Sequence, residues 1–509
     1  MQFERNSRDL GVRVLKGTTV LVAARLIVRS FSLINIVVLA RLLTPADYGI
    51  AALALAAIGA FTMFTDLKLA SALTALDKVE PAHLNTAFTL SLARGLIIAA
   101  ALFASADGIA AWMDAPQLGP VLKVLSAMFV LDGVVNPAFW MYQRNLDFSK
   151  EFGRATIAQA FASMVTIAVA FRLESYWAIV AGTLTGYAAN ALFSYWRIPF
   201  RPRLGLAHWR ELVGFSGWLT LQGIAAQLNT LAPRLLIPKM LSPAALGIYT
   251  IGREAVSLPL DELLAPLRRT FFPGFAAIKD DPERLRRSVR LATETLLAIA
   301  LPVGIGIAML SREIILVLAG DQWLGATIVL QALAPTTAVL MSTSAIVGLA
   351  MAKGELRPLF VRSLILAVLN WLGIAVGLYW YGFDGAIYAL AFNQLCALLI
   401  NLVFTRQLLG EPLWQWLADG WRSIVAAGAM AAVLAAIDLY TGERATGSLA
   451  ALGVLLPSVM IGAAVYSATH LLLWHLARRP AGFESNVIHY GGMVWGHMRN
   501  RASSPKSQA

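Results

Sequence analysis

Residues 14–50 read VLKGTTVLVAARLIVRSFSLINIVVLARLLTPADYGI. The apolar part, from about residue 18 to residue 40, is long enough to span a bilayer, because about 20 residues at a rise of 1.5 Å cover a core of about 30 Å. Arg25 and Arg29 lie near its middle, four residues apart, so both side chains leave one face of the predicted helix. A guanidinium facing lipid at this depth costs roughly 3 kcal/mol or more, and snorkelling does not rescue it.

The charged face of this predicted helix has two interpretations. In the first, the arginines line a wet cavity and bind an anionic substrate. In the second, they pair with an acid on a neighbouring helix, such as Asp66 or Asp132. We favour the cavity, but the residues alone leave both open.

The end of the same stretch recurs later in the chain. Residues 41–50 read RLLTPADYGI and residues 239–248 read KMLSPAALGI, with five identities and three conservative matches. Each copy lies at a turn between two apolar runs, which indicates a duplicated half. A weaker trace follows the fourth apolar run of each half, where Asp147, Phe152 and Arg154 are spaced like Glu355, Phe360 and Arg362.

Composition places the chain in the membrane. Of the 509 residues, 58% are hydrophobic and only 14% are charged, whereas a soluble domain has about 25% charged residues. The net charge of +12 fits the basic inner loops of a membrane protein better than a nucleic-acid partner. The single cysteine, Cys396, excludes an internal disulfide or a cysteine metal cluster. The first apolar run is too long for a cleaved signal peptide, and we expect it to be retained.

Hydropathy predicts an all-α polytopic protein with about fourteen transmembrane helices. The first twelve form two six-helix lobes, at residues 1–203 and 204–410, related by a pseudo-twofold axis along the membrane normal. A two-helix hairpin at 411–480 and a cytoplasmic tail at 481–509 follow. The predicted spans are 18–40, 46–66, 84–106, 117–138, 154–171, 175–196, 212–236, 244–266, 288–310, 325–350, 359–380, 384–405, 422–440 and 449–476.

The distribution of basic residues predicts the orientation. With the N-terminus inside, 30 of the 41 Lys and Arg residues fall in cytoplasmic segments and 5 in outer loops. This bias is typical of an inner-membrane protein with both termini in the cytoplasm. The outer loops are too short to form a domain outside the membrane.

The remaining intramembrane charges give the other candidate residues. Arg94 and Arg253 are candidates to join Arg25 and Arg29 in binding an anionic head group. The acids could couple an ion or balance the arginines; they are Asp66, Asp132, Glu254 and Asp261. Arg253 and Glu254 are adjacent and point about 100° apart on a helix, so they are not one ion pair.

Catalytic signatures are absent from the sequence. It contains no G-x-x-x-x-G-K-[ST], H-E-x-x-H or G-x-S-x-G motif, so we expect no enzyme, no cofactor and no metal site. The positive charge at membrane depth, together with the duplicated halves, favours a transporter with a cationic central cavity.

Three segments resemble one family. RLLTPADYGIAAL at 41–53, KMLSPAALGIYTI at 239–251 and YQRNLDFSKEFGRA at 142–155 are similar to the polysaccharide transporter, or Wzx-type flippase, branch of the multidrug/oligosaccharidyl-lipid/polysaccharide exporter (MOP) superfamily. The resemblance implies that the chain flips undecaprenyl-pyrophosphate-linked oligosaccharide units for O-antigen, capsule or exopolysaccharide assembly. It also implies membrane lipids, and possible polymerase and chain-length proteins, as partners. Arg234 stands where many relatives carry an acid, so no ion-coupling site is transferred there.

Two other transporters stay open as alternatives. A flippase for a lipid II-type peptidoglycan precursor would use a cationic cavity as well. A drug or cation antiporter would share the lobes but would need an acidic cavity, and the arginines argue against it.

Overall fold

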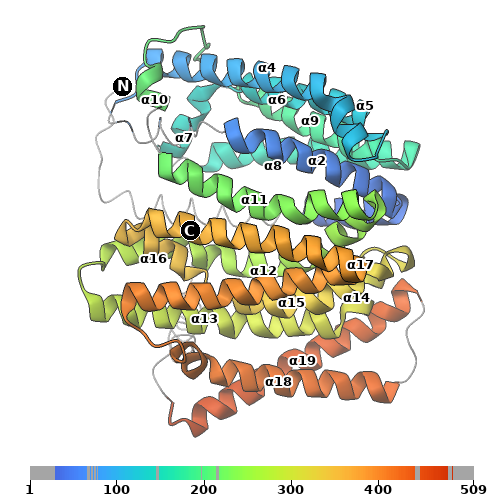
Figure 1. Cartoon of the computed structure of the whole chain (residues 1–509), viewed down its shortest axis with the longest axis vertical. Helices are drawn as coiled ribbons and strands as arrows, with labels where there is room; N and C mark the ends of the chain where they lie inside the picture. Colours follow the sequence, from blue (N-terminus) through green and yellow to red (C-terminus); the bar gives the residue numbers. More distant parts are fainter. Residues whose placement is uncertain are drawn as a thin grey trace, which may run out of the picture. The chain divides into compact units, whose positions relative to one another are not determined.

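The structure is a computed structural model that describes residues 29–65, 69, 73, 76, 78–144, 148–196, 198–213, 217–441, 447–479 and 484 (Figure 1). The chain folds into helices, and the described part contains no strand. Residues 29–42 are helical, as expected for the first predicted span. The chain divides into two compact units, which we describe separately. Unit 1 runs to Ile251 and includes Leu318–Trp323; unit 2 holds Gly252–Val317 and the chain from Leu324.

Unit 1 contains the helices of the first predicted lobe, two more helices, and the first turns of α12 (Pro243–Ala277). Its helices after residues 29–42 are α2 (Pro45–Thr65), α4 (Pro81–Trp112), α5 (Leu118–Leu125), α6 (Ala127–Gly133), η1 (Pro137–Phe139), α7 (Trp140–Arg144), α8 (Phe148–Leu173), α9 (Trp177–Phe193), α10 (Trp209–Val213) and α11 (Gly217–Met240). The two additional helices are α10, which packs against α4, and α11, which packs against α2. The division between the two compact units lies within α12, after its first turns. The lobe bounds at 203/204 and 410/411 stay a prediction.

Unit 2 contains the rest of α12 and the helices that follow it. These are α13 (Pro282–Met309), α14 (Ser311–Leu318), η2 (Asp321–Ala326), α15 (Thr327–Met341), α16 (Ala345–Lys353), α17 (Leu356–Leu409), α18 (Gln415–Thr441) and α19 (Ser448–Leu476); η2 and the end of α14 straddle the division. Gly382 interrupts α17 with φ 59° and ψ −137°, so α17 supplies the two spans predicted at 359–380 and 384–405. Helices α18 and α19 form the predicted hairpin and pack on each other.

The helices confirm an all-α polytopic membrane protein. Among the described residues, eight helices are long and apolar enough to cross a membrane. Two other predicted spans are helices that do not reach this length and hydropathy: α9 has only 17 residues, and α11 is a 24-residue helix that contains Pro233 and Pro238. Proline is tolerated within membrane helices where neighbouring groups satisfy the freed carbonyl. The total of about fourteen predicted spans is therefore compatible with these helices.

The repeated motif explains how α2 and α12 begin. Each helix starts at a proline, Pro45 or Pro243, where the missing N–H costs no hydrogen bond. The preceding hydroxyl caps the first turn: Thr44 Oγ1 accepts from the Asp47 N–H at 3.2 Å, and Ser242 Oγ accepts from the Ala245 N–H at 3.2 Å. The Thr-Pro and Ser-Pro pairs are thus the same helix-start signal, used once in each half.

The two copies of the motif also pack on each other, within unit 1. Gly49 in α2 lies against the carbonyl of Pro243, and Gly247 in α12 lies against the carbonyl of Pro45. The contact is reciprocal, as expected for two segments related by a local twofold. A Cβ on either glycine would approach the opposite carbonyl oxygen closer than 3.0 Å, so both positions require glycine.

A second pair of equivalent contacts supports the duplication. In unit 1, the Arg154 guanidinium donates to the Asn190 side chain. In unit 2, Arg362 Nε donates to Asn401 Oδ1 at 2.5 Å. Arg154 and Arg362 are the arginines that the sequence places at equivalent positions. In each unit an arginine at an equivalent position therefore donates to an asparagine of the following predicted span.

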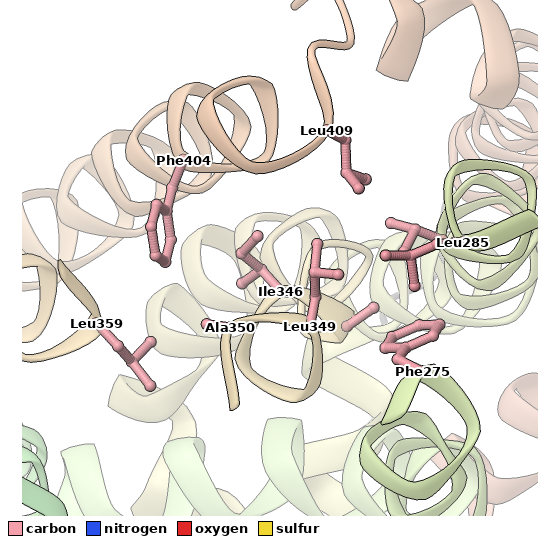
Figure 2. Close-up of a cluster of buried hydrophobic side chains, with 10 residues drawn as sticks. Phe275, Leu285, Ile346, Leu349, Ala350, Leu359, Phe404 and Leu409 are labelled. Carbon is pink, nitrogen blue, oxygen red and sulfur yellow. The ribbon is translucent and has the colours of Figure 1, made fainter. Parts of the chain in front are cut away.

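The core of unit 2 near the ends of α12, α16 and α17 is shown in Figure 2. Phe275 and Leu285 face each other across the α12–α13 connection, and Ile346 and Leu349 of α16 pack beside them. Burial of these side chains, at roughly 25 cal/mol per Å² of apolar surface, holds the helix ends together.

Candidate substrate-binding site

The first candidate pair is only half described. Arg29 is half-buried on the helix at residues 29–42, in unit 1. Arg25 and Asp66 lie outside the described residues. The structure thus places one guanidinium of the predicted pair on a membrane helix and partly out of solvent. Binding of an anionic head group by Arg25 and Arg29 stays a prediction.

Arg94 forms an ion pair with Asp132. Its Nη2 lies 2.6 Å from Asp132 Oδ2, and 21% of the Arg94 side chain and 41% of the Asp132 side chain are exposed. Helix α4 supplies Arg94 and the adjacent helix α6 supplies Asp132. Two predicted site residues are therefore brought together in one ion pair, which is compatible with the charge-balancing role that the sequence left open for the acid.

This pair can be tested by a double-mutant cycle. We expect Arg94→Ala and Asp132→Ala each to lower thermal stability, and the double variant to recover part of the loss, with a coupling of about 1 kcal/mol because both side chains are partly exposed. Stability is read from thermal unfolding in detergent, and transport is measured in parallel. Recovery of transport in the double variant would assign Arg94 to charge balance, whereas a persistent loss would assign it to the substrate. Additive stability changes would contradict the pairing.

The candidates on α12 separate into two groups. Arg253 and Glu254 are both half-buried. Their two side chains form no ion pair within the described part of the chain, as their adjacent positions predict. Asp261 accepts from Arg268 Nη2 at 2.6 Å, two helical turns further along α12. Asp261 therefore pairs with an arginine of its own helix, nearer to the end of α12 at Ala277. Arg253 keeps its place as a predicted cavity residue of unit 2.

A buried ion cluster in unit 2 was not predicted. The Arg422 guanidinium of α18 binds Glu294 of α13, and its Nε lies 2.9 Å from Glu484 Oε1. His470 Nε2 of α19 lies 3.0 Å from the same Glu484 oxygen. Arg422, His470 and Glu484 are 8%, 7% and 3% exposed. The cluster fastens the terminal helix pair to α13 and buries a residue of the segment that the sequence describes only as a tail.

The charges of this cluster also set the protonation of Glu484. Burial alone would raise the pKa of its carboxyl, but the hydrogen bond with His470 and the charge of Arg422 outweigh burial and hold that pKa below the usual 4.5. A carboxyl with a lowered folded pKa stabilises the folded state above its unfolded pKa and loses this contribution as the pH falls through the folded pKa. Docking of Glu484 is therefore complete at neutral pH.

The sequence did contain a signal for this ion cluster, since Glu294 and Arg422 are both charged residues near span ends.

One histidine group has ligand atoms close together, within 4.8 Å: Glu80, His83 and His208. The imidazoles of His83 and His208 are stacked with centroids 3.8 Å apart, and His83 Nδ1 accepts from the Glu80 N–H at 3.2 Å. Ring nitrogens bind metals in the ring plane, and in stacked rings these directions do not converge. This arrangement fits a helix cap better than a metal site.

Comparisons with known proteins point in one direction. A family model described as "Polysaccharide biosynthesis protein" matches residues 38–328. The lipopolysaccharide biosynthesis protein WzxC of Escherichia coli (strain K12) is 25% identical over 81% of this chain and 85% of its own length. The succinoglycan biosynthesis transport protein ExoT of Rhizobium meliloti (strain 1021) is 25% identical over 68% of this chain and 70% of its own.

Solved structures show the fold. The lipid II flippase MurJ in an inward closed conformation superposes with a TM-score of 0.72 at 15% identity and covers 90% of this chain and 99% of its own. An inward-facing multidrug resistance MATE family transporter of the MOP superfamily gives a TM-score of 0.56 at 16% identity, over 75% of this chain and 94% of its own.

Proposed function

We propose, from the premise that this chain belongs to the polysaccharide biosynthesis protein family, in the Wzx-type branch of the MOP superfamily, that it flips an undecaprenyl-pyrophosphate-linked oligosaccharide across the inner membrane. The product would supply O-antigen, capsule or exopolysaccharide assembly. The polyprenyl-linked sugar would enter a cationic central cavity from the cytoplasm, with both chain termini on that side, and leave by alternating access. Arg25, Arg29 and Arg253 would bind the pyrophosphate, whose oxygens match the guanidinium fork.

The observation that carries this proposal is the length of the likeness to WzxC. It extends over 81% of this chain and 85% of WzxC, on a scaffold of transporter type. Relatives are named for lipopolysaccharide, succinoglycan and teichuronic acid biosynthesis, and the succinoglycan relative is named a transport protein. A half-buried arginine on a membrane helix supports an anionic group on the cargo.

The lipid II-type flippase is the runner-up. The MurJ superposition favours it by fold, but 15% identity supports shared architecture only. The sequence relatives are polysaccharide proteins, so we assign the oligosaccharide carrier first. The antiporter alternative shares the MATE scaffold, again at the level of fold.

The proposal is tested by reconstitution. Vesicles carrying the purified chain should move a fluorescent undecaprenyl-pyrophosphate oligosaccharide between leaflets, read as loss of fluorescence to an outside quencher. We expect transport at least tenfold above that of protein-free vesicles, and weaker transport of lipid II. Equal rates with and without protein would refute the flippase, and a preference for lipid II would favour the runner-up.

A further inference from the structure

An apolar groove lies between α12 and α13 in unit 2. Arg253, the predicted cavity arginine of α12, is not one of its lining residues. Its volume is 290 Å³, and it opens to the surface. One wall is formed by residues of α12 and the other by residues of α13. The lining residues are Leu267, Thr270, Phe271, Gly274, Phe275, Ile278, Ser288, Leu291, Ala292 and Thr295.

Two features of α12 keep the groove open. Gly274 has no side chain, and a Cβ placed there would meet nothing within 4 Å. Phe271 and Phe275 lie one turn apart with ring centroids 5.8 Å apart and planes 9° from parallel. Phe275 is fixed in the core by Leu285 of α13, as Figure 2 shows. The groove floor is therefore set by packed side chains rather than by a loop.

The groove ends beside exposed cations. Arg284 and Arg287 are exposed on α13, and Arg284 lies one turn before Ser288, on the same face as the lining residues. Lys279 is exposed on the connection from α12. Among the described residues, neither Arg284 nor Arg287 has an ion-pair partner.

The acids of this connection do not cancel those cations. Asp281 accepts from the Arg284 backbone N–H at 3.0 Å as a helix cap, and Glu283 binds Arg286 at 2.6 Å. Asp280 is exposed and is the remaining acid of the turn. Arg284 and Arg287 therefore lie one helical turn before the lining residues Ser288 and Leu291, and both are without an ion-pair partner within the described part of the chain.

We propose that this groove binds the polyprenyl chain of the phosphorylated lipid carrier at the inner leaflet, with the phosphate on Arg284 and Arg287. The charges suit a phosphate ester, and the walls suit hydrocarbon. A volume of 290 Å³ is at the low end of ligand pockets, which span about 300–1,000 Å³, and suits a segment of one chain rather than the two chains of a phospholipid. This inference rests on the proposed function. It adds a second binding site, separate from the predicted cavity arginines, that selects the lipid carrier by its polyprenyl chain.

The first experiment compares carriers that differ only in chain length. Gly274→Leu should fill the groove and lower transport of the undecaprenyl-linked oligosaccharide about tenfold, while a carrier with a two-isoprene chain, too short to use the groove, changes less than twofold. Gly306→Leu is the matched control, because Gly306 is on α13 and also has open space around it. Equal losses for both chain lengths, or no loss for either, would overturn the groove assignment.

The second experiment reads binding without transport. A photoreactive undecaprenyl phosphate should label the α12–α13 segment of the wild-type protein in vesicles, and labelling should fall at least fivefold in Arg284→Gln/Arg287→Gln. Arg172→Gln, on the exposed end of α8, is the charge control. Competition by phosphatidylglycerol as strong as by undecaprenyl phosphate would replace the carrier with an ordinary phospholipid and refute the proposal. Labelling without any transport would instead count against the proposed flippase and leave the groove standing.

Discussion

Transport of the lipid-linked oligosaccharide should fall about 100-fold when Arg25 and Arg29 are both replaced by alanine. A hydrogen bond to a charged group contributes about 1.5–3 kcal/mol, and each 1.4 kcal/mol is tenfold in rate or affinity. Each single alanine variant should therefore lose about tenfold. Lysine at both positions should retain part of the rate, because it keeps the charge but loses the bidentate fork. The measurement is the initial flipping rate in vesicles at matched protein content.

Stability separates this effect from misfolding. On the proposed substrate-binding role, replacing Arg25 and Arg29 should lower transport while the thermal unfolding temperature changes little. Arg172→Ala serves as the control on an exposed helix end. Rates equal to wild type in the double variant would refute the role of the pair. A large fall in stability would show that the arginines pair with acids inside the protein.

Alanine at Gly49 or Gly247 should destabilise the protein by about 3 kcal/mol or more. Each added methyl would overlap the backbone carbonyl of Pro243 or Pro45, and overpacking of this kind typically costs about 1–3 kcal/mol even against movable side chains. Backbone groups at a helix crossing cannot rotate away, so the cost is higher here. The double variant should yield little folded protein in the membrane.

The control for these variants is Gly108→Ala. Gly108 is inside α4, and a Cβ there meets nothing within 4 Å. Glycine within a helix costs about 0.5–1 kcal/mol relative to alanine, so this substitution should raise the unfolding temperature slightly. Opposite signs at Gly49 and Gly108 are the expected result. A stabilising effect at Gly49 would mean that the two motif copies do not contact each other in the membrane.

Local signals account for what could be predicted well. The Thr-Pro and Ser-Pro pairs before α2 and α12 specify a capped helix start whatever surrounds them. The apolar runs gave the helices of both halves, including the two spans of α17 on either side of Gly382. The resemblance to the Wzx-type branch, made on three short segments, is confirmed by a family model that matches residues 38–328.

The ion-pair partners of the charged side chains could not be predicted from the sequence. Arg94 could have met a substrate or an acid, and its partner became Asp132 only because α4 and α6 pack side by side. Glu484 looked like part of a polar tail, yet it is 3% exposed between Arg422 and His470. Helix α11 packs on α2 within unit 1, which is a contact between segments far apart in sequence.

The sequence by itself determined that this chain is a duplicated bundle of membrane helices with guanidinium groups at membrane depth. Hydropathy, proline and hydroxyl caps act over a few residues, so the linear order is enough to read them. The tertiary structure alone assigned carboxylates to Arg94 and Arg422, set the two glycines against the opposite prolines, and opened the groove between α12 and α13. These features depend on which helix faces are neighbours, and the free energy of a charge or a cavity in a membrane is set by those neighbours.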